Sequence, residues 1–410
     1  MKGFLTAIIK PAHLAASAAE VDGLTLAKRR GDADRGHNVR ATDGEDDDRD
    51  ARSQAVARFR ECELQQQASS ASGAPPLAWL GPPPGCSPTA NQPSYYCAWH
   101  AALNGTYSGP LIHLQDKRVG QLLPPRTVVL LPFSCTASTD GSSLRECLRR
   151  LTAVMRANAC KPLAVITLHK IFERLDFKLR LIRAHGAVTK IYVPEYSPAL
   201  WGKIERLSGL PVGLLPYAAD DAVFGPFAAA TYKFDFGFTG GWQRFDGRYA
   251  LRSKLFASGG VVDRLRNETG MRFFLPERHK GFLPLPEYVR ALSSTKVWLA
   301  TTERDTLGSR FFEVLASGRA MLFCNRHPVA YAPLGIVEGT HAAMFNTTRE
   351  FEAVLRYYLR HETERLSIVR AARRLALRRH TWRGRAREFV RELPHAACGV
   401  QRNLSMCVSG

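Results

Sequence analysis

Short apolar runs alternate along the chain with longer amphipathic segments. The runs span six to eight residues and are rich in Val, Ile, Leu and Phe, which is typical of strands covered on both faces. The segments between them place apolar residues at helical spacing, and several end at a glycine. This alternation predicts parallel sheets covered by helices. The predicted strands are 126–133, 163–169, 188–195, 211–217, 233–240, 272–277, 296–302 and 319–324.

The alternation breaks once, at residues 218–232, which we expect to be a linker between two domains. The first predicted domain spans 94–217, and we assign it to the acceptor side of a two-substrate site. The second spans 233–348 and is predicted to bind the other substrate. Residues 349–394 are predicted to form helices that pack on the second domain, followed by a tail at 395–410. The predicted fold class is therefore α/β, with two doubly wound, Rossmann-like domains facing each other across a cleft.

The N-terminal region, residues 1–93, is polar, charge-mixed and rich in turn residues. We predict that it is a disordered or targeting region followed by a linker. Its first residues fit a weak signal or transit peptide, for an organelle or the secretory pathway, and they fit a disordered tail equally well, because Lys10 and Pro11 interrupt the apolar patch. On this interpretation, removal of residues 1–85 should leave a folded core.

The net charge of +20 over 410 residues indicates an anionic partner. Nearly all of the excess lies beyond residue 75, so it belongs to the predicted domains. Nucleic acid, an anionic membrane surface and phosphorylated small molecules all fit this charge. No apolar run approaches the roughly 18–20 residues of a membrane span, so a soluble protein is expected.

The nine cysteines have no CxxC spacing and no His/Cys cluster, so no zinc site is predicted. Their odd number and wide spacing indicate no disulfide framework, and the redox compartment stays open. Four N-x-S/T sequons, at Asn104, Asn267, Asn346 and Asn403, give only slight support for a secretory location.

The stretch DTLGSRFFEVLASGRAMLFCNRHP, residues 305–328, carries the clearest chemistry. Ser309 is a candidate N-cap for a helix, whose free N–H groups and dipole, together with Arg310, favour an anion such as a diphosphate. Glu313 lies about one turn along, where a carboxylate can accept hydrogen bonds from both hydroxyls of a ribose. The alternative is that Glu313 only complements the dipole at the start of the helix.

Gly240 and Gly241 follow a predicted strand, in the sequence FTGGW. Glycines there allow the backbone to approach a diphosphate closely, although an ordinary strand-to-helix turn has the same pattern. Basic side chains that could neutralise the diphosphate follow at Arg244, Arg248, Arg252 and Lys254.

Three segments together resemble GT-B glycosyltransferases, specifically the C-terminal domain of the spore-protein (CgeB-like) family. SRFFEVLASGRAMLFCNRHP with the Arg-rich tail that follows resembles the end of that domain. LPYAADDAVFGP, at 215–226, resembles the segment that joins the two halves, and FGFTGGWQ resembles the first strand and glycine turn of the donor domain. The resemblance covers residues 211–392.

The resemblance implies roles for individual residues. Glu313 matches the second acid of the E-x7-E motif, which binds the donor ribose, and Arg252 matches the basic position best. Asp305 stands where many relatives have the first Glu, and this departure puts its contact with the donor sugar in doubt. His169 and Glu195 end predicted strands of the first domain and are candidate general bases. The candidate catalytic residues are therefore His169, Glu195 and Asp305.

The leading interpretation is a hexosyltransferase-like enzyme that moves a sugar from a nucleotide-diphosphate donor to an unknown glycan, protein or small-molecule acceptor. The nucleotide sugar is a co-substrate, and no other cofactor is expected. The only acidic triplet, DDD at 46–48, lies in the polar N-terminal region, so metal independence is expected.

Two other classes stay open. The replacement of the first motif Glu by Asp305 fits a non-catalytic nucleotide-sugar or glycan binding protein that keeps the GT-B fold. Charge alone fits a basic nucleic-acid-binding protein, but no recognised motif for a specific nucleic acid is present. The tail at 349–402 has 14 Arg and 6 Glu, and we interpret it as the solvated basic face of a packed helix that could also contact an anionic membrane surface.

Overall fold

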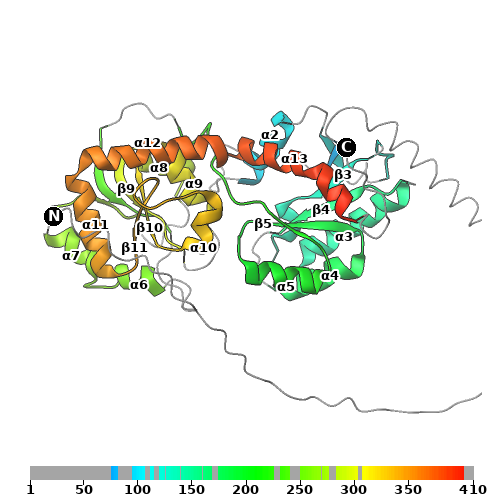
Figure 1. Cartoon of the computed structure of the whole chain (residues 1–410), viewed down its shortest axis with the longest axis horizontal. Helices are drawn as coiled ribbons and strands as arrows, with labels where there is room; N and C mark the ends of the chain where they lie inside the picture. The colour runs from blue at the N-terminus through cyan, green and yellow to red at the C-terminus, as the bar shows by residue number, and fades with distance from the viewer. Residues whose placement is uncertain are drawn as a thin grey trace, which may run out of the picture. The chain divides into compact units, whose positions relative to one another are not determined.

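The computed structural model describes residues 75–81 and 95–400, except 107–110, 115–119, 125, 139, 159, 169–173, 226–230, 241–249, 269, 277–282 and 303–306 (Figure 1). Within these residues the chain forms two parallel sheets, each covered by helices on both faces.

The first sheet has the strand order β2-β1-β3-β4-β5-β6, and every neighbouring pair is parallel. Its strands are β1 (Leu77–Leu80), β2 (Ile112–Leu114), β3 (Val128–Leu131), β4 (Leu163–Thr167), β5 (Val188–Val193) and β6 (Val212–Leu214). The helices between them are α2 (Tyr95–Thr106), the 3-10 turn η3 (Phe133–Thr136), α3 (Ser142–Ala157), α4 (Leu175–His185) and α5 (Pro198–Ser208).

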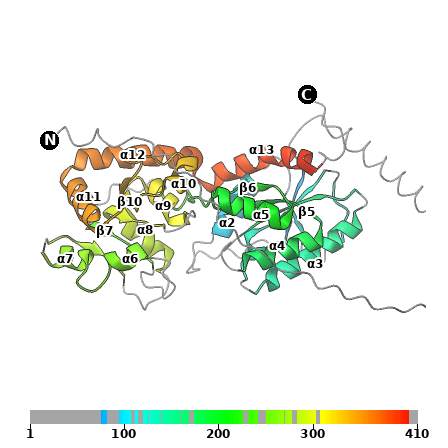
Figure 2. The same cartoon turned by 60° about the horizontal axis from the view of Figure 1, so that its bottom comes forward.

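Alternate residues of these strands face two separate cores. Ala78 and Leu80 pack in a core with α3, α4 and α5, which lie together on one face of the sheet (Figure 2). Leu77 and Trp79 point the other way and pack with Trp99 of α2. Because a strand with both faces buried needs apolar residues at every position, β1 and β3 show no polar alternation.

Strand β1 lies inside the region for which we predicted no ordered structure. Its four residues, LAWL, stand between two proline-rich stretches of sequence, and the run is too short for its pattern to distinguish it from a linker. In the fold it pairs with both β2 and β3 and is buried along its whole length. The first sheet therefore begins well before residue 94.

The second sheet has the order β11-β10-β9-β7-β8 and is also fully parallel. Its strands are β7 (Phe234–Gly237), β8 (Phe273–Phe274), β9 (Thr295–Leu299), β10 (Met321–Asn325) and β11 (Ala343–Phe345). Its helices are α6 (Ala250–Leu255), α7 (Val261–Glu268), α8 (Leu285–Ser293), α9 (Ser309–Ser317), α10 (Pro328–Tyr331), the 3-10 turn η4 (Ala332–Leu334), α11 (Thr348–Arg360) and α12 (Glu362–Arg379).

The second sheet is also covered on both faces. Trp298 and Leu322 pack with α8, α9 and part of α12 on one face. Val297 and Phe323 point to the other face and pack with α6, α7 and α11. The chain runs outward from β7 to β8 and then returns to β9 on the other side of β7. The strand order therefore reverses between β7 and β9, and ligands of such sheets bind beyond the carboxyl ends of the strands at this point.

The last helix, α13 (Trp382–Val400), packs on the first sheet. Our prediction placed the C-terminal helices on the second domain, so for α13 this prediction is wrong. Trp382 and Phe389 share a core with Trp99 of α2 and Tyr192 of β5. Helical spacing in the sequence shows that α13 has an apolar face, but it does not show which sheet that face covers.

The chain passes from α12 to α13 beside the segment that leaves the first sheet. Ala219 forms a parallel bridge with Thr381, through hydrogen bonds from Ala219 N to His380 O at 2.9 Å and from Trp382 N to Ala219 O at 3.0 Å. The nearby Phe224 is buried against Tyr288 of α8. The described part of the predicted linker is therefore packed structure. The predicted class, two parallel α/β domains with a helical C-terminus, is confirmed.

Removal of residues 1–85 should abolish the cooperative unfolding of the first domain, in contrast to what the sequence alone suggested. This truncation deletes β1, an interior strand whose loss would leave the facing edges of β2 and β3 without a hydrogen-bonding partner. A matched truncation that removes only residues 1–70 keeps β1 and should unfold cooperatively. Thermal unfolding followed by circular dichroism measures both, and equally cooperative transitions would show that β1 does not support the first sheet.

Candidate functional site

Polar residues gather where β7, β9 and β10 end. Thr239 and Gly240 follow β7, Thr301 and Thr302 follow β9, and Asn325 is the last residue of β10. These strands are neighbours and parallel, so their carboxyl ends meet at one edge of the sheet. Because the strand order reverses between β7 and β9, this edge is the expected binding position of a doubly wound sheet.

Glu313 is buried beside this edge, with 4% of its surface exposed. It is the fifth residue of α9, which begins at Ser309 with Gly308 as its N-cap. The predicted N-cap role of Ser309 is therefore wrong, since Ser309 is already inside the helix. Glu313 also lies beyond the first turn, where the dipole effect is concentrated. The dipole alone does not account for a carboxylate at this buried position.

The hydroxyl of Tyr288 donates a hydrogen bond to Oε2 of Glu313 at 2.9 Å. Tyr288 comes from α8 and is itself buried between Phe224 and Trp298. The aromatic packing fixes the ring of Tyr288, and the hydroxyl in turn orients the carboxylate. Tyr288 uses one of the hydrogen-bond acceptor positions of the Glu313 carboxylate. Other acceptor positions of this carboxylate are left for a ligand.

The charge state of Glu313 is set by opposing effects. Burial raises the pKa of its carboxyl group, because a charged form is poorly solvated there. The guanidinium of Arg310 and the hydroxyls of Ser309 and Tyr288 lower the pKa but do not cancel the burial. Burial and the nearby Glu313 raise the pKa of Tyr288, so this residue stays a hydrogen-bond donor.

Gly240 and Arg310 meet although they are far apart in sequence. A Cβ at Gly240 would lie 3.0 Å from a terminal guanidinium nitrogen of Arg310, and the φ of Gly240 is +127°, a conformation that favours glycine. The Nε of Arg310 and the hydroxyl of the buried Thr239 have no hydrogen-bond partner among the described residues. Buried polar atoms without a partner are costly, and a bound anion would satisfy both.

Arg252 lies at the same edge but is held by its neighbours. Its Nε donates to Oγ1 of Thr301 at 2.9 Å, and a terminal nitrogen donates to the carbonyl of Thr301 at 3.0 Å. Its guanidinium also lies over the ring of Phe238, 5.3 Å from the centroid. These contacts join the ends of β7 and β9, so Arg252 shapes this edge of the sheet.

Asn325 fixes the other side of the loop after β9. Its Oδ1 accepts from the backbone N–H of Thr302 at 2.9 Å, and its side-chain amide donates to the Thr302 carbonyl at 2.5 Å. The carbonyl of Asn325 accepts from the Tyr331 hydroxyl at 2.8 Å. The chain that leads toward α9 is therefore anchored to β10 before it reaches Arg310 and Glu313.

The remaining predicted site residues are only partly placed. Gly241, Asp305 and His169 lie outside the described residues. Glu195 follows β5 in the first sheet and is buried, and its backbone carbonyl accepts from Nε1 of Trp201 at 2.7 Å. The structure thus brings together Gly240, Arg252, Arg310 and Glu313, with Ser309 at the start of the same helix.

Sequence reasoning missed Tyr288, Thr239 and Asn325. Thr239 and Asn325 each end or follow an apolar run, and a polar residue at that point of a parallel strand is a usable signal. Tyr288 gives no such signal, because its contact with Glu313 joins residues 25 positions apart through tertiary packing. Within the described residues no group of three or more His, Cys, Asp or Glu side chains is placed to hold a metal ion. No described helix has both the length and the apolar character of a membrane span.

Residues 228–391 match the family model described as glycosyl transferase-like. No curated protein matches the chain. Sucrose-phosphate synthase from Thermosynechococcus elongatus is similar in structure, with 11% identity and a TM-score of 0.50 over 79% of this chain and 100% of that chain. HepE from Anabaena, solved in complex with UDP-glucose, gives 11% identity and a TM-score of 0.46 over 78% and 99% of the two chains. At these identities the likeness concerns the fold. The chain therefore has a GT-B fold, and its second half is similar to the glycosyl transferase-like family model.

Replacement of Glu313 by Gln should stabilise the protein at neutral pH. The folded-state pKa of Glu313 lies above its unfolded value, so its contribution to stability is most favourable at low pH and is lost as pH rises through the folded pKa. Gln keeps the shape without the buried charge. The melting temperature of Glu313→Gln minus that of the wild type should therefore be close to zero in acid and should grow toward pH 7.

Glu287→Gln is the matched control for this experiment. Glu287 is exposed in the first turn of α8, where a carboxylate complements the helix dipole, so its replacement should destabilise slightly, by about 0.3–1 kcal/mol. A clear loss of stability in Glu313→Gln at neutral pH would mean that the carboxylate serves the fold.

Proposed function

We propose that the protein is a glycosyltransferase that uses a nucleotide-diphosphate sugar, and that the donor binds at the carboxyl edge of the second sheet. The observation that carries the proposal is the buried, oriented carboxylate of Glu313 beside Arg310 and Gly240. The family match at residues 228–391 includes all three residues and supports the same conclusion. The finer CgeB-like assignment rests on the sequence resemblance alone and is part of the proposal.

Glu313 is proposed to bind the ribose of the nucleotide. A carboxylate can accept two hydroxyl hydrogen bonds, and the diol of a ribose presents two hydroxyls at matching spacing. Tyr288 holds Oε2 in place, so less orientation is lost when the ribose binds. Burial disfavours the charged form of Glu313, and hydrogen bonds from the two hydroxyls of a ribose would favour it.

The diphosphate is proposed to lie between the turn after β7 and the start of α9. Gly240 has no side chain to keep the phosphate away from the backbone, and the Arg310 Nε and the Thr239 hydroxyl are donors without partners among the described residues. The free N–H groups at the start of α9 favour the same negative charge. Donors fixed in this way stabilise the nucleotide diphosphate as it leaves, which assists transfer of the sugar without a metal ion.

Asp305 is proposed to contact the donor sugar, and His169 and Glu195 are proposed as candidate bases on the acceptor side. The donor sugar, the nucleotide base and the acceptor are left to experiment. If Asp305 does not replace the usual Glu functionally, the same site would bind a nucleotide sugar without transferring it. This binding protein is the second candidate function.

Calorimetric titration with UDP and GDP tests the proposed site, and Glu313→Gln is the decisive variant. A hydrogen bond to a charged group contributes about 1.5–3 kcal/mol, so the variant should bind the preferred nucleotide about tenfold more weakly or worse. The wild-type advantage should shrink as pH falls through the raised pKa of Glu313, because the protonated form resembles Gln. Unchanged affinity in Glu313→Gln at neutral pH would remove the main support for the donor site.

Hydrolysis and transfer assays with a panel of nucleotide sugars distinguish the two candidate functions. Turnover of one donor supports the glycosyltransferase. Binding that depends on Glu313, without turnover of any donor by wild-type protein or with any acceptor tested, supports the binding protein.

Gly240→Ala tests the diphosphate position separately. The added methyl group would crowd the Arg310 guanidinium at 3.0 Å, and the positive φ adds strain. Nucleotide diphosphates should bind at least tenfold more weakly, whereas the corresponding nucleosides should be affected little. Gly259→Ala is the control, since Gly259 also has a positive φ, of +69°, but has open space around its Cβ position. Equal losses in the two variants would indicate backbone strain and not a phosphate site.

A further inference from the structure

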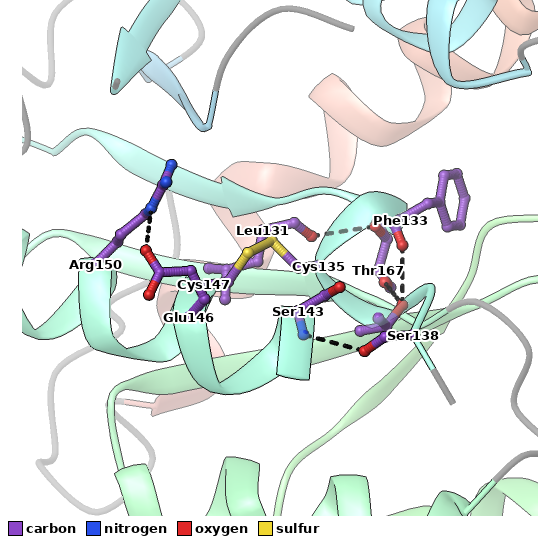
Figure 3. The surroundings of a disulfide bond; sticks show 10 residues. Leu131, Phe133, Cys135, Ser138, Ser143, Glu146, Cys147, Arg150 and Thr167 are labelled. Atoms are coloured by element: carbon purple, nitrogen blue, oxygen red, sulfur yellow. Dashed lines mark hydrogen bonds and ion pairs between the residues drawn. A yellow bond between two sulfur atoms is a disulfide. The ribbon is translucent and has the colours of Figure 1, made fainter. Parts of the chain in front are cut away.

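The first domain contains disulfide bonds. Cys135 of η3 is bonded to Cys147 of α3, with the two Cα atoms 5.7 Å apart (Figure 3). Cys97 of α2 and Cys160 are also disulfide-bonded. The prediction of no disulfide framework was therefore wrong, because cysteine spacing in sequence does not show which elements the fold brings together.

The bond lies in well-packed structure and not on a loose surface loop. Cys135 is buried beside Thr136, whose hydroxyl bonds the carbonyl of Thr167 in β4 at 3.1 Å. On the outer side of α3, Glu146 pairs with Arg150 in the same neighbourhood (Figure 3). A disulfide in such a setting ties η3 to α3 and acts as a structural bond.

Cys324, in β10, is a free thiol that solvent does not reach. Burial raises the pKa of Cys324 to about 12, so it stays protonated and unreactive. Cys97, Cys135, Cys147 and Cys160 are therefore bonded, and Cys324 is shielded from oxidation. Structural disulfides form and persist in oxidising compartments and are rare where thiols are kept reduced.

Two sequons lie fully within the described residues and have exposed asparagines. Asn104 is in the last turn of α2, with Thr106 ending the helix. Asn346 follows β11, with Thr348 as the first residue of α11. An N-linked glycan is bulky and hydrophilic, so it requires a surface position of this kind.

The local structure at Asn346 leaves its side chain available. The hydroxyl of Thr347 caps α11 by accepting from the Glu350 N–H at 3.1 Å. The backbone N–H of Asn346 donates to Oε2 of Glu350 at 2.7 Å. The turn is thus held by the cap and the backbone, and the exposed carboxamide of Asn346 is not used to form it.

We propose that the chain matures in an oxidising secretory compartment and carries N-linked glycans on Asn104 and Asn346. The donor is an oligosaccharide joined to a lipid diphosphate. The side-chain amide nitrogen bonds to the anomeric carbon and loses a proton, while the bond from that carbon to the phosphate oxygen breaks and the lipid diphosphate leaves. This modification does not depend on the proposed donor site of the second sheet.

The test is expression of the full chain with its own N-terminus in cultured eukaryotic cells. Glycan removal by peptide N-glycosidase in heavy-oxygen water converts a modified Asn to a mass-labelled Asp, which peptide mass spectrometry locates. Labelled Asp is expected at positions 104 and 346. Alkylation without reduction should leave the Cys135 and Cys147 peptides joined.

Matched variants separate the sequon from the fold. Thr106→Ala and Thr348→Ala should each remove the label from the neighbouring site, whereas Thr106→Ser and Thr348→Ser should keep it. Absence of label at both sites, or alkylation of Cys135 and Cys147 as free thiols in the freshly lysed cells, would overturn the proposal. Either result would leave nucleotide binding by the second domain unaffected.

Discussion

The structure depends on one constraint, which is that both parallel sheets must be covered on both faces. Their strands are apolar at almost every position, so neither face can be left to water. In the second sheet the local helices α6 to α12 meet this need. In the first sheet α3, α4 and α5 cover one face, and the other is completed by α2 together with α13 from the far end of the chain.

The same packing produces the candidate site. Glu313 is held in a buried position by α9, and its orientation depends on Tyr288, which is fixed by aromatic neighbours of a different helix. Arg252 and Asn325 anchor the loop after β9 from opposite sides. The edge of the sheet is therefore preorganised, and the Arg310 Nε and Thr239 hydroxyl, which have no partner within the described part of the chain, lie among fixed neighbours.

Much of the second domain could be predicted from sequence, since β9, α9 and β10 follow directly from an apolar run, a glycine stop and a second apolar run. Glu313, Arg310 and Gly240 were predicted as site residues for the same reason, because Gly240 follows a strand and Arg310 and Glu313 lie in the first residues of a helix that follows a strand. The sequence pattern failed where tertiary structure decides. Strand β1 is too short to show a hydrophobic period. Helix α13 packs on a sheet that is distant from it in sequence. The hydrogen bond from Tyr288 to Glu313 and the disulfides join residues that no local sequence pattern relates.

The position of α13 also constrains the order in which the protein can fold. Synthesis proceeds from the N-terminus, so β1 to β6 emerge long before residues 382–400. Until then the core around Trp99 and Tyr192 lacks Trp382 and Phe389, and its apolar surface stays open on the ribosome. The second domain has all of its strands and covering helices by Arg379 and can fold first. The half of the protein that is translated first is thus the half that is completed last.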